Sequence, residues 1–240
     1  MHYLRLKNTK SEKCRKNGTR EVIPIWVEKS RKYGRVIQEQ ALSRRKCLLI
    51  TGLNNAGKSH WMTRLYDNAL DIWGGQPRIT GRLFLSGLSA IGAWHEQDNL
   101  IDWYERQKAK SDPVWKRLLG HQKDQKLVEY CKRVNTVVFI DDAHKLTGRK
   151  ADLAKQCIQK AKLNVVAVSQ ENRLPASIRD EVLRRNPQII RLNSPVAYDM
   201  TGLVIWGLAG LAAVSGFWQL ALVLVGLRWL ASGRFAARQD

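Results

Sequence analysis

The sequence has 240 residues, of which 44% are hydrophobic and 26% charged, values ordinary for a globular protein with one α/β domain and a small additional module. Its charge is not ordinary: 41 Lys and Arg against 21 Asp and Glu give +20 at pH 7, which favours nucleic acid or an anionic membrane face as partner. The four cysteines form no CxxC pair and have no histidine at zinc-ligand spacing, which argues against a zinc site.

Half of the excess charge lies near the N-terminus. Residues 1–46 contain 14 Lys or Arg and 4 Glu, a net charge of +10. Residues 1–27 are therefore predicted to form a basic arm, which is either solvated or in contact with nucleic acid or anionic lipid. The first seven residues contain no apolar core, so no cleavable signal peptide is expected.

Two elements are predicted before the first buried strand. Residues 21–27 are β-rich but interrupted by Pro24, which favours an edge strand or an extended linker. Residues 28–45 have the apolar spacing of a helix, with Val36, Ile37 and Leu42 as its apolar points.

Strand and helix signals alternate along the rest of the chain up to residue 192. Short apolar runs predict strands at residues 47–51, 82–85, 136–140, 164–169 and 188–192. Helical patterns predict helices at residues 58–73, 94–110, 113–133, 151–162 and 175–185. Strands separated by helices indicate βαβ units, and the continuous apolar runs indicate strands covered on both faces. The predicted fold is α/β with a parallel sheet.

A phosphate-binding loop is predicted between the first of these strands and the following helix. Its residues match G-x-x-x-x-G-K-[ST] without deviation, and the flanking strand and helix are those that the motif requires. Its backbone N–H groups and the helix N-terminus form an anion nest, Lys58 is expected to reach the β- and γ-phosphates, and Ser59 to ligate Mg²⁺. The predicted nucleotide-binding residues are Gly52, Leu53, Asn54, Asn55, Ala56, Gly57, Lys58, Ser59 and His60.

Two carboxylates follow the apolar strand at residues 136–140. In open α/β sheets ligands bind at the carboxyl ends of the strands, where Asp141 and Asp142 are predicted to lie. Asp141 is expected to hold the Mg²⁺ shell through water, and Asp142 to position or activate the attacking water. The alternative is a pair of ordinary turn residues at a strand end.

The order of loop, extra strand and Asp-Asp strand resembles the additional-strand division of P-loop ATPases, especially its AAA+ members, over about residues 30–192. The resemblance implies a γ-phosphate sensor where the strand at 164–169 ends, and Ser169 and Gln170 match that position; alternatively, both merely cap the strand. Family members usually carry Glu where this chain has Asp142. That shorter carboxylate leaves a non-hydrolysing nucleotide switch as an alternative to hydrolysis.

The same resemblance implies an arginine that reaches the γ-phosphate of a neighbouring subunit in a homo-oligomer. Arg184 and Arg185 match its position, and a guanidinium there would stabilise charge on the transferring phosphoryl group. The alternative is a solvated surface role for either arginine. The helical lid of AAA+ modules is expected to be missing or replaced, because an apolar segment takes most of residues 193–240.

That apolar segment, residues 203–230, contains a single charge, Arg228, and is predicted to cross a membrane. One transmembrane helix and a helical hairpin turning at Ser215 and Gly216 are both open. The hairpin is preferred, because it moves Trp218 to an interface and returns the basic tail to the ATPase side. A buried core helix or an amphipathic surface helix is the alternative.

The sequence thus predicts three parts: a basic arm (1–27), a P-loop ATPase domain (28–198) and a membrane anchor with a basic tail (199–240). Its expected function is ATP hydrolysis with Mg²⁺ by an oligomeric motor or remodelling ATPase of a macromolecule-transport or mobile-element system. The ATPase domain would lie in the cytoplasm, at an inner membrane of bacterial type. A DNA-binding AAA+-like ATPase of a mobile element is the alternative.

Overall fold

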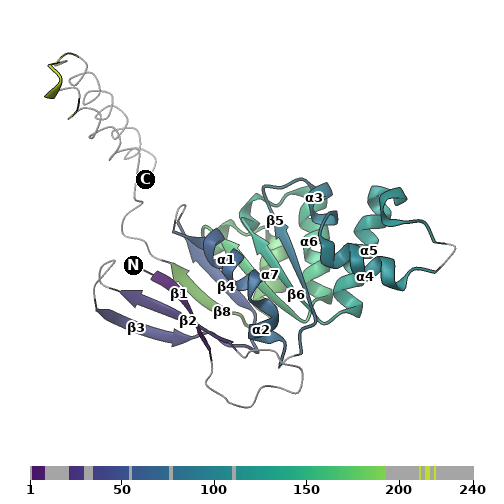
Figure 1. Ribbon diagram of the computed structural model, residues 1–240, viewed down its shortest axis with the longest axis horizontal. Coiled ribbons are helices and arrows are strands. Elements are labelled where there is room, and N and C mark those ends of the chain that lie inside the picture. Colours follow the sequence, from purple (N-terminus) through teal and green to yellow (C-terminus); the bar gives the residue numbers. More distant parts are fainter. Residues whose placement is uncertain are drawn as a thin grey trace. The chain divides into compact units, whose positions relative to one another are not determined.

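The computed structural model describes residues 2–8, 22–29, 35–53, 56–75, 78–109 and 112–192. It also describes five residues of the C-terminal region: Leu211, Val214, Ser215, Gly216 and Gln219. The chain divides into two compact units, Met1–Pro195 and Val196–Asp240. In the first unit, helices cover both faces of a parallel sheet, and a smaller antiparallel sheet is formed by the N-terminal strands (Figure 1).

Five parallel strands form the main sheet. In spatial order they are β5 (Gly81–Ser86), β6 (Thr136–Asp141), β7 (Leu163–Val168), β4 (Leu48–Gly52) and β8 (Gln188–Leu192). Every residue of β6 and β7 is buried, as expected for central strands covered on both faces. The predicted α/β fold with a parallel sheet is confirmed. One strand, β7, lies between β4 and β6, which is the additional-strand arrangement.

The helices that pack on the sheet lie close to their predicted positions. They are α1 (Lys58–Asp67), α2 (Ala69–Trp73), α3 (Ile91–His95), α4 (Asp98–Gln107), α5 (Gly120–Arg133), α6 (Gly148–Lys160) and α7 (Ala176–Arg184). Short 3-10 turns lie at Trp115–Arg117, Ala143–Lys145 and Glu171–Arg173. The single helices predicted at 58–73 and 94–110 are each divided, the first at Asn68 and the second at residues 96–97, between α3 and α4.

Each face of the sheet has its own hydrophobic core. Because alternate residues of a strand point to opposite faces, β6 contributes Val138 and Ile140 to one core and Val137 and Phe139 to the other. The first core is completed by apolar residues of α3 to α7, and the second by those of α1, α2 and the N-terminal strands. Both cores hold the carboxyl ends of β4 and β6 at one edge of the sheet.

Three tryptophans in the segment from α3 to α5 are buried. Trp94, Trp103 and Trp115 are 1%, 9% and 4% exposed and belong to the same core. The Nε1 atom of Trp94 donates to the Ser86 carbonyl oxygen and so joins α3 to β5, and the Nε1 atom of Trp115 donates to the His95 carbonyl oxygen and so joins the 3-10 turn to α3.

The N-terminal region forms a three-stranded antiparallel sheet, in the order β1 (His2–Asn8), β2 (Val22–Lys29) and β3 (Val36–Ala41). The segment predicted to be a basic arm therefore contains β1 and most of β2, and Leu4 and Val22 are buried in the second core. Residues 21–27 were predicted to form an edge strand or linker, but β2 is the middle strand. Pro24 is tolerated because it lies beyond the last residue of β3, which pairs with Ile25.

The helix predicted at residues 28–45 is wrong, because the end of β2 and all of β3 occupy this segment. All six residues of β3 are exposed, including Val36 and Ile37 at 43% and 64%. The apolar residues of β3 thus do not mark a buried face, and their spacing does not distinguish a strand from a helix. Hydrogen bonds to β2 hold the strand instead.

The predicted membrane segment, residues 203–230, lies outside the described residues apart from the five already named. Leu211 and Val214 are helical and exposed, and Ser215 and Gly216 form a turn in which Gly216 has a φ of 82°. The turn coincides with the bend of the predicted hairpin. Within the described residues, no helix has the length and apolar character needed to cross a bilayer.

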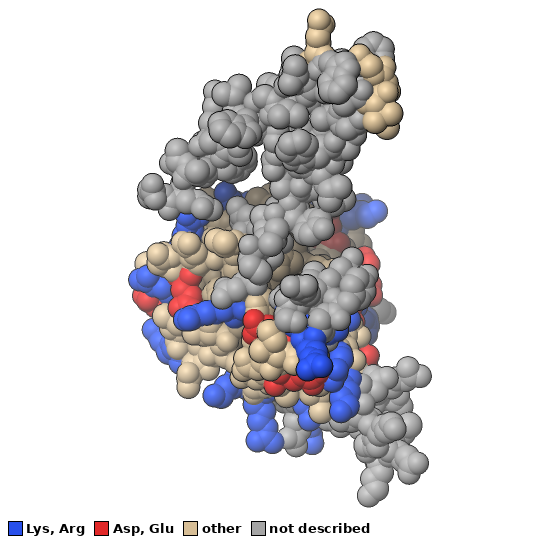
Figure 2. All heavy atoms as spheres, turned by 90° about the vertical axis from the view of Figure 1, so that its left-hand side faces the viewer, with Lys and Arg blue, Asp and Glu red and all other residues tan. Residues whose placement is uncertain are grey.

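Charged side chains cover much of the visible surface. On the face shown in Figure 2, basic side chains are interspersed with acidic and uncharged ones. Mixed charges of this kind are ordinary for a solvated surface, so a place where basic residues gather without acidic ones is the exception.

Candidate nucleotide-binding site

The predicted phosphate loop connects the end of β4 to the start of α1. Of its eight residues, Asn54 and Asn55 lie outside the described residues. Gly52 approaches the neighbouring strand closely, since a Cβ there would lie 2.7 Å from the carbonyl oxygen of Leu192. Gly57 has a φ of 85°, in the left-handed region that favours glycine. The two motif glycines are thus required for different reasons, close approach and backbone angle.

Lys58 begins α1 and points back into the loop. Its side chain is only 6% exposed, and its Nζ donates hydrogen bonds of 2.8 Å to the carbonyl oxygens of Gly52 and Leu53. Burial lowers the pKa of Lys58, while the negative charges of Asp142 and Asp141 oppose this shift. The ammonium therefore lies inside the loop, close to two carboxylates.

Asp141 ends β6 and lies beside the first turn of α1. Burial raises the pKa of its carboxyl, and a hydrogen bond with the Ser59 side chain is the strongest opposing effect. The carboxylate also accepts the Asp142 backbone N–H at 2.9 Å. The fold thus brings Ser59 and Asp141, the two predicted Mg²⁺ ligands, close together at the carboxyl ends of the strands. His60, the next residue of α1, is exposed.

Asp142 follows with a φ of 49°, in the left-handed region that few residues other than glycine adopt. Its backbone is packed against Gly87, where a Cβ would lie 2.3 Å from the Asp142 carbonyl oxygen. The Gly87 N–H donates to the Asp141 carbonyl oxygen at 2.8 Å. Gly87 therefore holds the two-carboxylate turn in place. Sequence reasoning missed this role, although the Ser86-Gly87 pair that ends β5 was its signal.

Ser169 comes directly after β7, the strand between β4 and β6. Thr51 of β4 pairs with Val168, so Ser169 lies level with Gly52 at the start of the loop. The residue is 7% exposed, and among the described residues its Oγ has no hydrogen-bond partner. Buried hydroxyls nearly always have a partner, so this atom fits a site for an additional polar group. Gln170, the other sensor candidate, is exposed.

His144 and Arg173 also lie near the loop, and sequence reasoning did not select them. Burial lowers the pKa of His144, and its other electrostatic partners include Asp142, Lys58 and Arg173. The imidazole Nδ1 is buried and has no partner among the described residues. No ligand spacing marks His144 in the sequence, and only the fold brings it close to Lys58.

The residues present fit a Mg²⁺–nucleotide complex. The described residues contain no group of three or more His, Cys, Asp or Glu side chains arranged to hold a metal ion. One carboxylate and one hydroxyl, Asp141 and Ser59, face the loop instead. This donor set suits Mg²⁺, which is commonly held by one or two carboxylates together with phosphate and water oxygens.

Arg184 and Arg185 lie elsewhere, at the end of α7 and next to the amino end of β8. The site residues are at the carboxyl ends of the strands, so within one chain neither arginine meets Lys58. Arg184 has a 73% exposed side chain and an ion pair with Glu181 at 3.4 Å. The Arg185 guanidinium donates hydrogen bonds of 2.9 and 3.1 Å to the carbonyl oxygens of Ala161 and Gln159.

No protein-family model matches this chain, and a comparison with curated proteins finds no significant match. Solved structures of low similarity include a variant of RuvB from Thermotoga maritima, at 16% identity and a TM-score of 0.33. Another is the Orc1 protein of Aeropyrum pernix in complex with DNA, at 12% and 0.43. A third is EccC of Thermomonospora curvata (ATPases 2 and 3) with a signal sequence peptide, at 14% and 0.38.

These alignments cover 62%, 81% and 70% of this chain, respectively, and 38%, 55% and 34% of the solved chains. The chain thus spans about a third to a half of the length of these proteins. Its own strand order and loop show an α/β fold whose parallel sheet resembles that of P-loop NTPase domains.

Proposed function

We propose that this chain binds ATP with Mg²⁺ and hydrolyses it. The observation that carries the proposal is the meeting of Lys58, Ser59, Asp141 and Asp142 at the carboxyl edge of the sheet. Two of these residues belong to the loop motif and two come from a strand about 80 residues later, so their convergence is a property of the fold.

The loop residues act by position and charge. Lys58, now held by the carbonyl oxygens of Gly52 and Leu53, would exchange these partners for phosphate oxygens. The N-terminus of α1 directs its free N–H groups at the same charge. Mg²⁺ held by Ser59 and Asp141 would neutralise charge on the phosphates.

Asp142 is proposed to orient the attacking water. Its left-handed backbone is held between Asp141 and Gly87, and strained backbone often marks a functional turn. Ser169 would donate its unpartnered hydroxyl to a γ-phosphate oxygen. Both groups stabilise the reaction by being fixed beforehand, which is the main source of catalysis in phosphoryl transfer.

Phosphate release from ATP by the purified full-length chain tests this proposal. Lys58→Ala and Asp141→Asn are each expected to lower kcat by about 100-fold, while Lys116→Ala, an exposed lysine in the 3-10 turn after α4, leaves it unchanged. Nucleotide binding without any Mg²⁺-dependent turnover in the wild type would contradict hydrolysis and favour the nucleotide switch. Failure to bind nucleotide would refute the whole proposal.

The domain organisation is part of the same proposal. Residues 28–198 are assigned to the ATPase, residues 1–27 to a basic segment that contacts nucleic acid or anionic lipid, and residues 199–240 to a membrane anchor. The single charge in residues 203–230 supports the anchor, and the turn at Ser215 and Gly216 favours the hairpin form. The ATPase would then lie on the cytoplasmic side of an inner membrane of bacterial type, which membrane fractionation tests.

An arginine acting between subunits of a homo-oligomer is proposed as Arg184. Its guanidinium is exposed, whereas Arg185 is already committed to two carbonyl oxygens of its own chain. Mixing Lys58→Ala chains with Arg184→Ala chains tests this role. Hydrolysis restored in the mixture supports it, and no restoration counts against it.

The work driven by hydrolysis is proposed to be the movement or remodelling of a macromolecule, in a transport or mobile-element system. The net charge of +20 supports an anionic substrate. Addition of single-stranded DNA to the ATPase assay tests this point, since a substrate of a motor raises kcat and an unrelated polyanion leaves it unchanged.

A further inference from the structure

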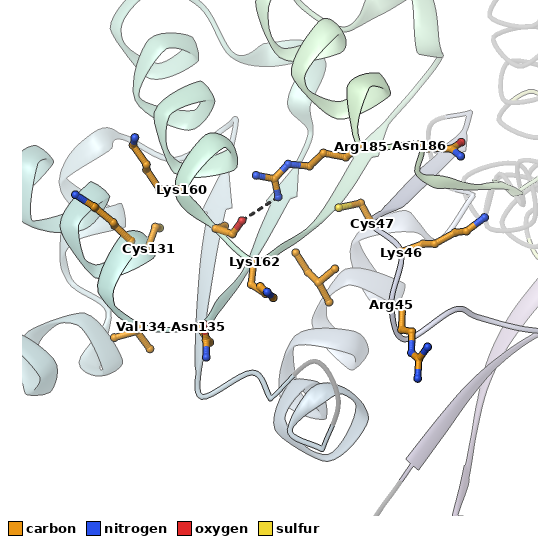
Figure 3. A pocket seen from close by; sticks show the side chains of 13 residues that line it. Arg45, Lys46, Cys47, Cys131, Val134, Asn135, Lys160, Lys162, Arg185 and Asn186 are labelled. Atoms are coloured by element: carbon orange, nitrogen blue, oxygen red, sulfur yellow. Dashed lines mark hydrogen bonds between the residues drawn. The ribbon is translucent and has the colours of Figure 1, made fainter.

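A basic pocket lies at the opposite edge of the main sheet from the phosphate loop. It has a volume of about 480 Å³ and is lined by residues at the amino ends of the strands, including Cys47 before β4, Asn135 before β6 and Leu163 in β7. Figure 3 shows this pocket, with Asn186 and Arg185 on the side of α7. No part of the nucleotide site lines it.

Six basic side chains line the pocket, and no acidic side chain does. The six residues are Arg45, Lys46, Lys132, Lys160, Lys162 and Arg185. They come from the segment before β4, the end of α5, the end of α6 with the turn that follows it, and the end of α7. The absence of acidic side chains from the lining distinguishes the pocket from the face shown in Figure 2, where basic and acidic side chains are mixed.

The charges of the four lysines in the pocket are not neutralised by any described residue. None of the four lysines has an ion pair with a described residue, and all four are exposed. Arg185 is oriented by hydrogen bonds of 2.9 Å to the Ala161 carbonyl oxygen and 3.1 Å to that of Gln159, so its guanidinium is held at the wall. Like charges gathered in a hollow repel one another, and a bound anion relieves that repulsion.

We propose that this pocket binds the phosphodiester backbone of single-stranded nucleic acid, independently of nucleotide binding at the phosphate loop. Lysine and arginine are the usual phosphate ligands, and the amides of Asn135 and Asn186, both in the lining, can donate to phosphate or sugar oxygens. A backbone strand carries several phosphates in a row, which matches basic residues distributed over four segments.

The lining residues also indicate that the pocket does not recognise the bases of a nucleic acid. It contains no Trp, Tyr or Phe, so it offers no surface on which a base can stack. Binding is therefore expected to be independent of base sequence and strongly dependent on salt. A concave pocket is also a poor match for a flat membrane surface, which makes nucleic acid the favoured polyanion.

The test measures binding of a fluorescein-labelled oligothymidylate of about 20 nucleotides to the full-length chain by fluorescence anisotropy. The buffer contains EDTA and no nucleotide. The variant carries Lys160→Gln with Lys162→Gln, and the control carries Lys116→Gln with Arg117→Gln, two exposed residues outside the pocket. Each variant removes two positive charges. A loss of binding in the pocket variant alone therefore reflects the pocket and not the total charge of the protein. Arg185 is left intact because it also holds α6.

The wild type is expected to bind, with an affinity that falls as salt rises. If two phosphate contacts are lost, the slope of log K against log salt falls by about 1.4, which corresponds to roughly 25-fold weaker binding at about 0.1 M salt. The control variant is expected to bind as the wild type does. The exposed positions of all four residues predict unchanged thermal unfolding in both variants.

Three results would overturn the proposal: no binding by the wild type, equal losses in the two variants, or retained binding in the pocket variant. Pyrophosphate binding that needs Lys160 and Lys162 without oligonucleotide binding would identify a small-anion site instead. Selective loss of binding to phosphatidylserine vesicles would assign the pocket to a membrane surface. Since no nucleotide is present, these outcomes are separate from success or failure of the ATPase proposal.

Discussion

At the scale of single residues, the phosphate loop depends on one backbone angle. Gly57 has a φ of 85°, and nothing lies within 4 Å of the place where a Cβ would stand. A side chain there would meet no steric contact in the fold, so any loss on substitution comes from the backbone itself. Left-handed backbone costs an L-residue roughly 1–2 kcal/mol.

Gly57→Ala is therefore expected to lower the free energy of unfolding by about 1 kcal/mol and to weaken nucleotide binding. Gly92→Ala is the matched control, because its Cβ also meets nothing within 4 Å but its φ is not in the left-handed region. Gly92 lies in α3, where alanine is expected to be neutral or stabilising by about 0.5 kcal/mol. Urea unfolding of both variants checks this, and equal shifts would show that backbone angle is not the cause.

Tyr130 predicts a loss of stability at alkaline pH. Burial raises its pKa from 10.0 to about 12, and the residue is only 3% exposed. Between pH 10 and about 12 the unfolded chain releases this proton and the folded chain keeps it, so stability falls as pH rises through that window. The loss from this group is expected to be no more than roughly 3 kcal/mol.

Tyr130→Phe keeps the ring against Trp103, where the ring centroids are 5.4 Å apart, and removes the ionisable group. The variant is expected to show a shallower decline of unfolding free energy from pH 10 to about 12 than the wild type. Denaturant titrations at several pH values measure this decline. Identical slopes would mean that Tyr130 ionises normally.

Much of the candidate site was predictable from single residues. Gly52, Lys58, Ser59 and Asp141 belong to contiguous patterns whose chemistry is local, and the fold brings them together as expected. Gly87 was not found, because no local pattern in the sequence marks its role beyond the end of a strand. Gly87 matters only because β5 lies beside β6.

At the scale of elements, the main sheet shows how a free strand edge is completed. β5 is an outer strand, and the Gln97 side chain pairs with it as a neighbouring strand would. Gln97 Oε1 accepts from the Phe84 N–H at 2.8 Å, and Nε2 donates to the Phe84 carbonyl oxygen at 2.8 Å. The side chain thus satisfies both backbone groups of one residue and blocks pairing with another chain.

Gln97→Ala leaves these two half-buried backbone groups without their partner and is expected to cost about 1–3 kcal/mol of stability. Glu96→Ala, at the exposed neighbouring position, is the control and is expected to change stability by less than about 0.5 kcal/mol. Thermal or denaturant unfolding gives both values. A small effect at Gln97 would mean that water replaces the side chain at no cost.

The sequence predicted the helices and strands whose burial follows a regular pattern. It did not predict the strands that are held only by pairing with neighbouring strands. β6 and β7 are continuous apolar runs because both faces are covered. β3 is exposed along its whole length, so its residues do not show the apolar pattern of a buried strand. β1 lies in a basic stretch whose apolar residues have no regular spacing. β1 and β3 are held by backbone hydrogen bonds to another segment, and such bonds do not require a particular pattern of side chains.

At the scale of the whole molecule, charge and apolar character are distributed unevenly. Residues 1–46 carry a net charge of +10, and residues 203–230 carry one charge. The two compact units meet between Pro195 and Val196 along the chain. The proposed ATPase domain and the proposed anchor are therefore separable by a cut in this region.

Membrane fractionation is expected to recover the full-length chain in the membrane pellet, resistant to carbonate extraction. A chain that ends after Asp199 is expected in the supernatant, with its ATPase activity retained, because the site lies within Met1–Pro195. Recovery of the full-length chain in the supernatant would rule out the anchor. Recovery of both chains in the pellet would assign membrane binding to the basic N-terminal region.

The sequence by itself determined the phosphate loop, the carboxylate pair and the alternation of strands and helices, because each is specified by residues close together in the chain. Only the tertiary structure decided that β7 separates β4 from β6, that β1 to β3 form a second sheet, and that six basic residues from four segments surround one pocket. The physical reason is that strand pairing and side-chain packing join distant segments. Their energy depends on geometry that no local pattern contains.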